Sequence, residues 1–154
     1  MAAPDKSTYR LAVVRPVWLP FNNTAKLIVD GLMLELGYPT TGPKATKYAV
    51  VVASVLKAAQ TVEGSPRSEK PTYLGIQRKA SAWSRYPLVG RDIAKRVIDD
   101  LIIRFGASFI EGSGDSGLHK DKKDKWRTDP IMSMYKIDLT RLPSDLASAR
   151  FIEV

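Results

Sequence analysis

A glycine-rich stretch carries the most explicit chemical motif in the chain. Gly112, Gly114 and Gly117 have the G-x-G-x-x-G spacing of dinucleotide-binding loops, and a predicted strand precedes them. Such a loop works only where a helix begins directly after it, because the amides at the helix start bind the phosphate oxygens. The following residues, HKDKKDKW, have no apolar periodicity. We therefore exclude a dinucleotide site and expect no small-molecule cofactor.

Nucleophilic and metal-assisted chemistry are also poorly supported. Residues 114–117, GDSG, match the local nucleophile pattern of chymotrypsin-like proteases. Ser116 nevertheless lacks a separately positioned base, because the only histidine, His119, lies three residues further on. Asp99 and Asp100 are adjacent and so point to different sides of a helix. The chain has no cysteine and no acidic or histidine cluster with metal-ligand spacing. We expect neither enzyme activity nor a metal site.

The distribution of charge suggests a polyanionic partner. The 154-residue chain has a formal net charge of +8. Residues 65–96 hold eight basic and two acidic residues, a net of +6, whereas residues 97–154 hold nine and ten, a net of −1. A surface this one-sided attracts polyanions, of which nucleic acid is the commonest in the cytoplasm. A solvated basic face that only keeps the protein soluble is the alternative.

The segment 91–105 is predicted to be an amphipathic helix with a basic beginning. Its apolar residues at 93, 97, 101 and 105 form one stripe on a 3.6-residue repeat. Arg91, Lys95 and Arg96 take the other side, near the helix start. A helix that enters a DNA groove needs this division, with an apolar face against its own domain and donors toward bases and phosphates. An ordinary surface helix would show a similar pattern.

The polar loop 112–128 and the stretch 78–86 add basic groups on both sides of this helix. The loop is long for a compact domain, and its lysines alternate with Asp121 and Asp124 before it closes on Trp126. We interpret the basic residues of both segments as phosphate contacts. Trp83 and Tyr86 are interpreted as core packing.

The elements that must position these residues follow from periodicity and from turn residues. An extended, proline-marked arm leads into a helix over 24–36 that ends at Gly37, and a long Ala- and Val-rich scaffold helix over 44–63 follows Pro43. A short strand over 73–79, a short helix or turn near 81–87, and the 91–105 helix come next. Strands are predicted over 107–111 and 131–138, on either side of the polar loop.

The order of these elements from residue 44 to 138 resembles that of winged helix-turn-helix DNA-binding domains. In that class a scaffold helix, a small strand, a second helix and a recognition helix precede a two-stranded hairpin, whose loop is the wing. The residues that carry the resemblance are Ile93, Val97, Ile98, Leu101, Gly106, Ala107, Phe109 and Ile110. Two departures are a recognition helix about one residue longer than usual, and Ile102 and Ile103 in place of a charged pair, which suggests an additional apolar contact.

The residues and the resemblance together predict an α+β fold, a winged helix-turn-helix domain with an additional N-terminal helix and extended arm. We expect residues 1–43 to form the arm and helix, 44–138 the DNA-binding domain and 139–154 a tail. The expected function is sequence-specific binding of double-stranded DNA, in transcription regulation or in replication and partition. The expected DNA-binding residues are Arg78, Lys79, Arg85, Arg91, Lys95, Arg96, Lys120, Lys122, Lys123, Lys125 and Arg127. Of these, Arg91, Lys95 and Arg96 are expected to enter the major groove.

Partner and location complete the expectations. The helix over 24–36 is apolar on more than one face, so it is a candidate for homodimerisation. A signal-peptide core and an apolar run of membrane-spanning length are both absent from the sequence, so we expect a cytoplasmic protein without membrane association. Two alternatives remain open. One is a protein-interaction module that buries Ile102, Ile103 and the first helix, and the other is a single-stranded nucleic-acid or RNA binder with Trp83, Tyr86 or Trp126 exposed.

Overall fold

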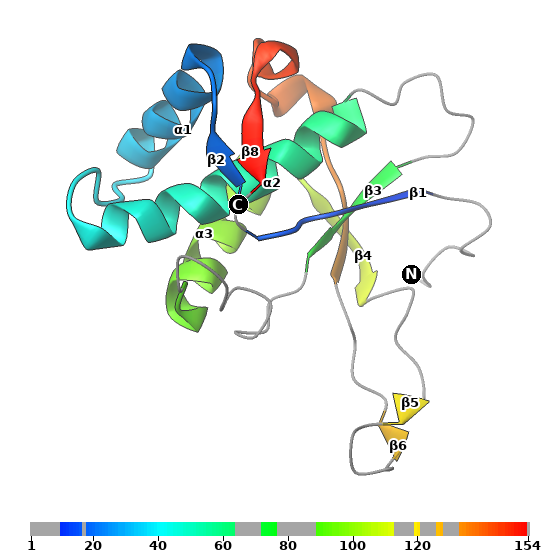
Figure 1. Cartoon of the computed structure of the whole chain (residues 1–154). Coiled ribbons are helices and arrows are strands. Elements are labelled where there is room, and N and C mark those ends of the chain that lie inside the picture. The colour runs from blue at the N-terminus through cyan, green and yellow to red at the C-terminus, as the bar shows by residue number, and fades with distance from the viewer. Residues whose placement is uncertain are drawn as a thin grey trace.

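A computed structural model describes residues 10–16, 18–63, 72–76, 89–112, 119–120, 126–127 and 133–153. Three α-helices and eight strands lie in these ranges, with two short 3-10 helices near the end (Figure 1). They are β1 (Arg10–Val13), β2 (Trp18–Pro20), α1 (Asn23–Glu35), α2 (Pro43–Glu63), β3 (Thr72–Ile76), α3 (Arg91–Arg104), β4 (Ser108–Gly112), β5 (His119–Lys120), β6 (Trp126–Arg127), β7 (Ser133–Lys136), η3 (Leu139–Arg141), η4 (Leu146–Ser148) and β8 (Phe151–Glu153). The α+β class predicted from the sequence is confirmed.

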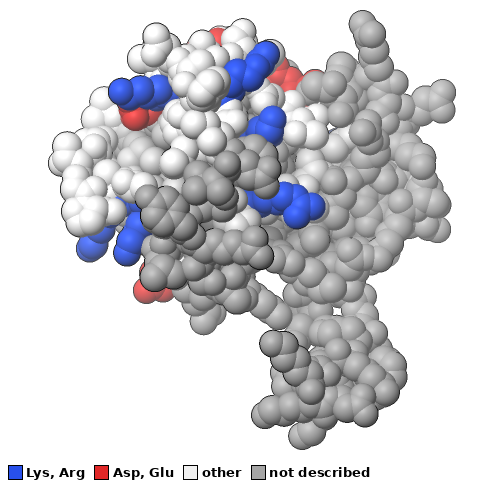
Figure 2. Space-filling view, in the orientation of Figure 1, with Lys and Arg blue, Asp and Glu red and all other residues white. Residues whose placement is uncertain are grey.

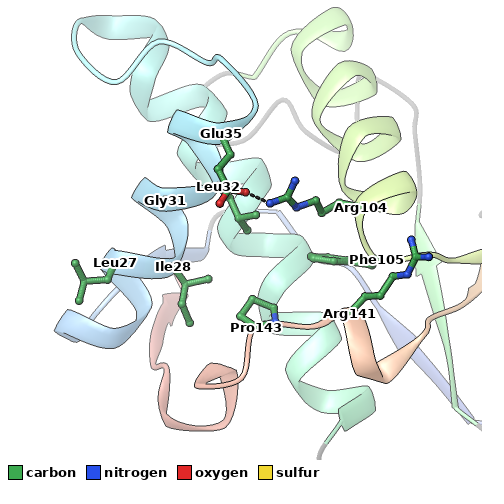
Figure 3. Close-up of a pocket in the computed structure, with 9 residues that line it drawn as sticks. All are labelled: Leu27, Ile28, Gly31, Leu32, Glu35, Arg104, Phe105, Arg141 and Pro143. Atoms are coloured by element: carbon green, nitrogen blue, oxygen red, sulfur yellow. Dashed lines mark ion pairs between the residues drawn. The ribbon is translucent and has the colours of Figure 1, made fainter.

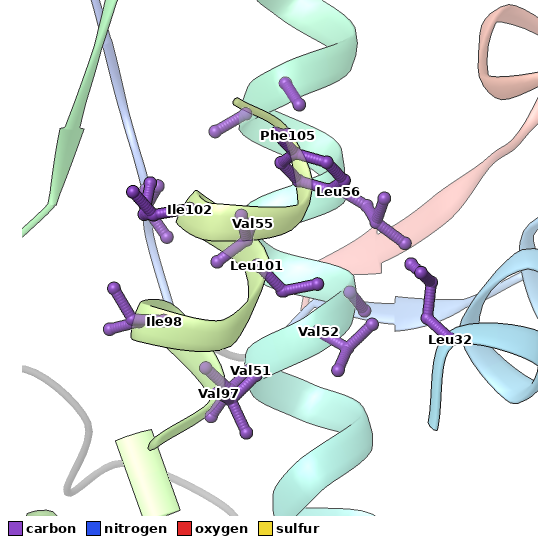
Figure 4. Close-up of a cluster of buried hydrophobic side chains, with 14 of the residues drawn as sticks. Leu32, Val51, Val52, Val55, Leu56, Val97, Ile98, Leu101, Ile102 and Phe105 are labelled. Carbon is purple, nitrogen blue, oxygen red and sulfur yellow. The ribbon is translucent and has the colours of Figure 1, made fainter. Parts of the chain in front are cut away.

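Helix α2 is the centre of the core. Its small and β-branched residues leave almost no polar face, and from Val50 to Leu56 every side chain is buried. In Figure 1 it runs between α1 and α3, and it also packs against β1, β2 and β3. Figure 4 shows the contact with α3, in which Leu101 and Phe105 lie among the valines of α2. The scaffold helix expected from composition is confirmed with nearly the predicted bounds.

The main sheet has the strand order β1-β3-β7-β4. Strands β3, β7 and β4 are antiparallel neighbours, whereas β1 lies parallel to β3 with Arg10 opposite Thr72. Between β4 and β7 in sequence, β5 and β6 form a separate antiparallel pair, which Figure 1 places away from the sheet. The segment expected to be a plain polar loop therefore contains a short hairpin ladder.

Two helices end at the glycines that the sequence indicates. Gly37 follows α1 with φ +73° and Gly106 follows α3 with φ +61°, a region that favours glycine. At α3 the amide of Ala107 donates to the carbonyl of Ile102 at 3.0 Å, and at α1 the amide of Tyr38 donates to that of Met33 at 2.9 Å. These bonds satisfy helix-end carbonyls and turn the chain sharply. The turn after α1 directs Tyr38 toward α3, and the turn after α3 leads the chain into β4.

The segments predicted as arm and tail pair with each other. Strand β2 is antiparallel to β8, and the Phe21 amide donates to the Arg150 carbonyl at 2.8 Å. Asn22 caps α1 by accepting from the amide of Ala25 at 2.9 Å, and its Nδ2 donates to the Ser148 carbonyl at 2.8 Å. The arm also supplies β1 to the main sheet. The arm and the tail therefore both pack on α1 and α2, and α2 is the scaffold helix of the predicted DNA-binding domain.

The remaining comparisons with the sequence concern side chains and boundaries. On α1, Val29 and Leu32 are buried, whereas Leu27 and Leu34 face outward. On α3, Ile102 is buried in the chain's own core while Ile103 is exposed, so the two do not form a joint apolar contact surface. Strand β3 covers the first part of the predicted strand. The short helix expected near 81–87 lies outside the described residues.

Gln60 of α2 fixes the C-terminal segment, which yields a stability prediction. Its Nε2 donates to the carbonyls of Leu146 and Ala149, at 2.8 and 2.7 Å. Gln60→Met keeps the length of the side chain but leaves both carbonyls without this donor. We expect the free energy of unfolding to fall by about 1–3 kcal/mol in urea denaturation. Lys26→Met, at an exposed position of α1, is the control. An unchanged midpoint for Gln60→Met would contradict the assigned role.

Candidate nucleic-acid interface

Helix α3 divides into a buried face and a solvent face, as its sequence predicts. Ala94, Val97 and Leu101 are fully buried, and the stripe continues to Phe105. Ile93, which begins the predicted stripe, is half-buried. The apolar face docks α3 on α2 (Figure 4). Asp92, Lys95 and Arg96, on other sides of the helix, are exposed.

Two of the predicted DNA-binding residues, Lys95 and Arg96, are exposed on the solvent side of α3. Among the described residues, neither of them forms an ion pair with an acid. Their positions differ by about 100° around the helix axis. Lys95 therefore projects on one flank of the solvent face, whereas Arg96 lies on the flank toward the start of α2.

Arg96 is held by two tyrosines. Its Nη1 donates to the Tyr48 hydroxyl at 3.2 Å, and its guanidinium carbon lies 5.0 Å from the centre of the Tyr38 ring and 5.7 Å from that of Tyr48. The two rings are 4.7 Å apart and tilted by 31°. A guanidinium within about 6 Å of aromatic rings gains cation–π stabilisation and keeps its charge. Arg96 is thus oriented, still cationic and accessible at the surface.

Tyr38 links this arginine to an acidic residue of the same helix. The Tyr38 hydroxyl donates to Oδ2 of Asp100 at 2.5 Å, although the two residues are 62 positions apart in sequence. Burial, followed by this hydrogen bond, raises the pKa of the Tyr38 hydroxyl well above its ordinary value. The bond occupies one carboxylate oxygen of Asp100 and directs this acid toward the turn that follows α1. No ion pair forms between Asp100 and Arg96 among the described residues.

The beginning of α2 adds two cations that the sequence analysis did not select. Lys44 is exposed and Lys47 half-exposed, and the first turn of α2 has no acidic residue. Figure 2 shows basic side chains at the left edge of the molecule, where α2 begins. The positive end of a helix dipole usually attracts acids, so lysines here favour an anionic ligand. Lysines without acids at a predicted helix start are therefore the sequence signal that could have identified Lys44 and Lys47.

Acidic residues lie within the same surface. Asp92 is exposed in the first turn of α3, where a carboxylate is favourable, and Asp99 is half-buried two turns later. Together with Asp100 they balance part of the charge of the described cations. The surface is therefore a mixture of both signs with a small excess of positive charge.

The other predicted contact residues are not placed by the structure. Six of them lie outside the described residues: Arg78, Lys79, Arg85, Lys122, Lys123 and Lys125. Three belong to described elements, but their side chains are not described: Arg91 of α3, Lys120 of β5 and Arg127 of β6. Trp83 and Tyr86 also lie outside, and only the backbone of Trp126 is described. The described cations of the candidate surface are therefore Lys95, Arg96 and the two lysines of α2.

The described residues give no support to a metal site or a membrane span. Within the described ranges, no three His, Asp or Glu side chains gather into a set that could hold a metal ion. None of the helices that the structure describes could serve as a membrane span. Comparisons of the chain with protein-family models, with curated proteins and with solved structures find no match.

The Tyr38–Asp100 bond predicts a pH dependence of stability. Because the hydroxyl pKa is raised in the folded state, the proton contributes stability below about pH 10, the ordinary tyrosine value, and this stability is lost as the pH rises further. Tyr38→Phe removes the bond and should lower the free energy of unfolding by about 1–2 kcal/mol at neutral pH. In urea denaturation from neutral to alkaline pH, the difference from wild type should shrink above about pH 10. A difference that stays constant contradicts the assignment.

Proposed function

We propose that this chain binds double-stranded DNA without catalysing a reaction, with the solvent face of α3 and the start of α2 toward the duplex. The observation that carries the proposal is the sidedness of α3. Its apolar face is fixed on the core, while Lys95 and Arg96 are exposed and form no ion pair with a described acid. A helix that reads a groove needs a rigid attachment and free cationic donors at once.

The order of elements supports the same proposal. Helix α2, strand β3 and helix α3 precede the antiparallel strands β4 and β7, and the β5–β6 pair lies between those two strands in sequence. This order is similar to that of winged helix-turn-helix domains, in which the helix before the hairpin binds DNA. In the proposal α3 is the recognition helix and the β5–β6 hairpin is the wing.

The two exposed cations of α3 have different proposed roles. Lys95 has no described contact that restrains it, so we assign it to base edges or phosphates within the major groove. Arg96 is fixed against Tyr48, beside the beginning of α2. We assign it, with Lys44 and Lys47, to the phosphate backbone, where a fixed cation sets the register of a protein on the duplex. This assignment changes the sequence-based expectation that Arg96 enters the groove.

Removal of the α3 cations tests the proposal directly. Lys95→Ala/Arg96→Ala should weaken binding to mixed-sequence duplex DNA at least about tenfold at low salt, because phosphate and base contacts supply most of the affinity. Fluorescence anisotropy with a labelled duplex measures the effect. Lys26→Ala, an exposed lysine of α1, is the matched control and should bind like wild type. Circular dichroism confirms that each variant is folded.

Several results would end the proposal. Wild-type protein that ignores duplex DNA at low salt contradicts it, and so does a double variant that binds as tightly as wild type. Stronger binding to single-stranded DNA or RNA than to the duplex would favour the stacking alternative. Binding that hardly changes with salt would favour a protein-interaction module, because apolar contacts release few counterions.

The lysines of α2 generate a second, more specific prediction. Each phosphate contact contributes roughly 0.9 to the slope of log affinity against log salt concentration. Lys44→Ala/Lys47→Ala should therefore reduce this slope by about 1–2, with the ranking of different duplex sequences unchanged. Anisotropy titrations at several salt concentrations measure both quantities. An unchanged slope would remove α2 from the interface.

A further inference from the structure

The outer face of α1 exposes large apolar side chains. Leu27 is 70% exposed and Leu34 is 74% exposed, although other residues of the same helix are buried in the core. With Gly31 between them, they follow the i, i+4, i+7 spacing that places residues on one side of a helix. Two large apolar side chains exposed on the same side of one helix, beside the exposed Asp30, suggest a surface that meets another protein.

Nothing in the described chain accounts for Gly31. Its φ is not positive, unlike those of Gly37, Gly42 and Gly106, so its backbone does not require glycine. A Cβ atom at this position would meet no heavy atom within 4 Å, so no packed neighbour requires it either. A glycine inside a helix is less stable than alanine by roughly 0.5–1 kcal/mol. An open glycine on a helix surface does allow the backbone of another helix to approach closely.

A groove of about 280 Å³ lies beside this face (Figure 3). Its apolar lining comes from Ile28 and Leu32 of α1, Phe105 at the end of α3, and Pro143. Leu27 stands at its rim and points away from the core, whereas Ile28 points into the space beside Pro143. The same chain thus presents a projecting leucine next to an apolar hollow.

Charges around the groove are balanced, which argues against a polyanion as its occupant. Glu35 pairs with Arg104 across the groove, and Arg141 pairs with Asp138 at 3.6 Å. A polyanion finds no net positive charge to bind here. A second copy of this chain presents the same balanced border, so the rim itself brings no excess of like charge together, although each copy carries a formal charge of +8.

We propose that this face is the interface of a homodimer, in which α1 of one copy packs against α1 of the other about a two-fold axis near Gly31. Under such symmetry each chain supplies both the projecting leucine and the groove, so one contact satisfies both copies. The bare backbone at Gly31 allows the helices to approach closely, and Leu27 of each copy enters the groove of the other. The charged pairs form the polar rim of the interface. This inference does not depend on duplex binding.

Sedimentation equilibrium of the full chain without nucleic acid tests the dimer. Wild type should move from the 17.1 kDa monomer mass toward twice that mass with rising concentration, and should do so even at about 0.5 M salt, because apolar contacts are little screened. Leu27→Glu and Gly31→Leu should each raise the dimer dissociation constant at least about tenfold. Ile152→Glu, an exposed apolar position on β8, is the matched control and should dimerise like wild type.

Gly31→Leu separates loss of the interface from loss of the fold. The space above Gly31 is open, and leucine favours helices more than glycine does. At a protein concentration low enough for wild type to be monomeric, where dimerisation adds nothing to its stability, the melting temperature of this variant should therefore equal or exceed that of wild type. The inference is overturned if wild type keeps the monomer mass throughout, if Leu27→Glu and Gly31→Leu dimerise like wild type, or if Ile152→Glu weakens the dimer equally. A monomer that still binds duplex DNA would overturn this inference alone.

Discussion

The burial of helix α2 on all of its sides is the constraint from which the rest of the structure follows. Seven consecutive residues of this helix, from Val50 to Leu56, are inaccessible to solvent, so no single neighbouring layer can cover them. Two helices, the main sheet and the β2–β8 pair each cover a part of the surface. Because apolar burial is the dominant favourable contribution to folding, the positions of these elements are set by α2.

This constraint also determines where charge can collect. Helix α3 must turn Leu101 and Phe105 toward α2, which leaves its basic residues on the outside. The turn at Gly37 places Tyr38 against Asp100, and Tyr48 near the start of α2 meets Arg96. The orientation of a surface arginine therefore depends on contacts among all three helices. The geometry of the candidate interface is therefore set by the packing of the core.

Features with local causes could be predicted from the sequence, and features with distant partners could not. The ends of α1 and α3 follow from Gly37 and Gly106, and the Ala- and Val-rich composition of α2 identifies it as a buried helix. The parallel pairing of β1 with β3 and the pairing of β2 with β8 leave no mark in either segment alone. The Tyr38–Asp100 bond likewise joins residues 62 positions apart, so periodicity within one helix could not identify it.

The hydrogen bonds from Gln60 can form only late in the synthesis of the chain. Their acceptors, at Leu146 and Ala149, are made 86 and 89 residues later in the chain. At roughly 5–20 residues per second, a ribosome needs on the order of ten seconds to add that length. Throughout this interval the apolar surface of α2 lacks part of its cover. Until the last strand emerges and pairs with β2, this apolar surface is exposed and can make non-native apolar contacts.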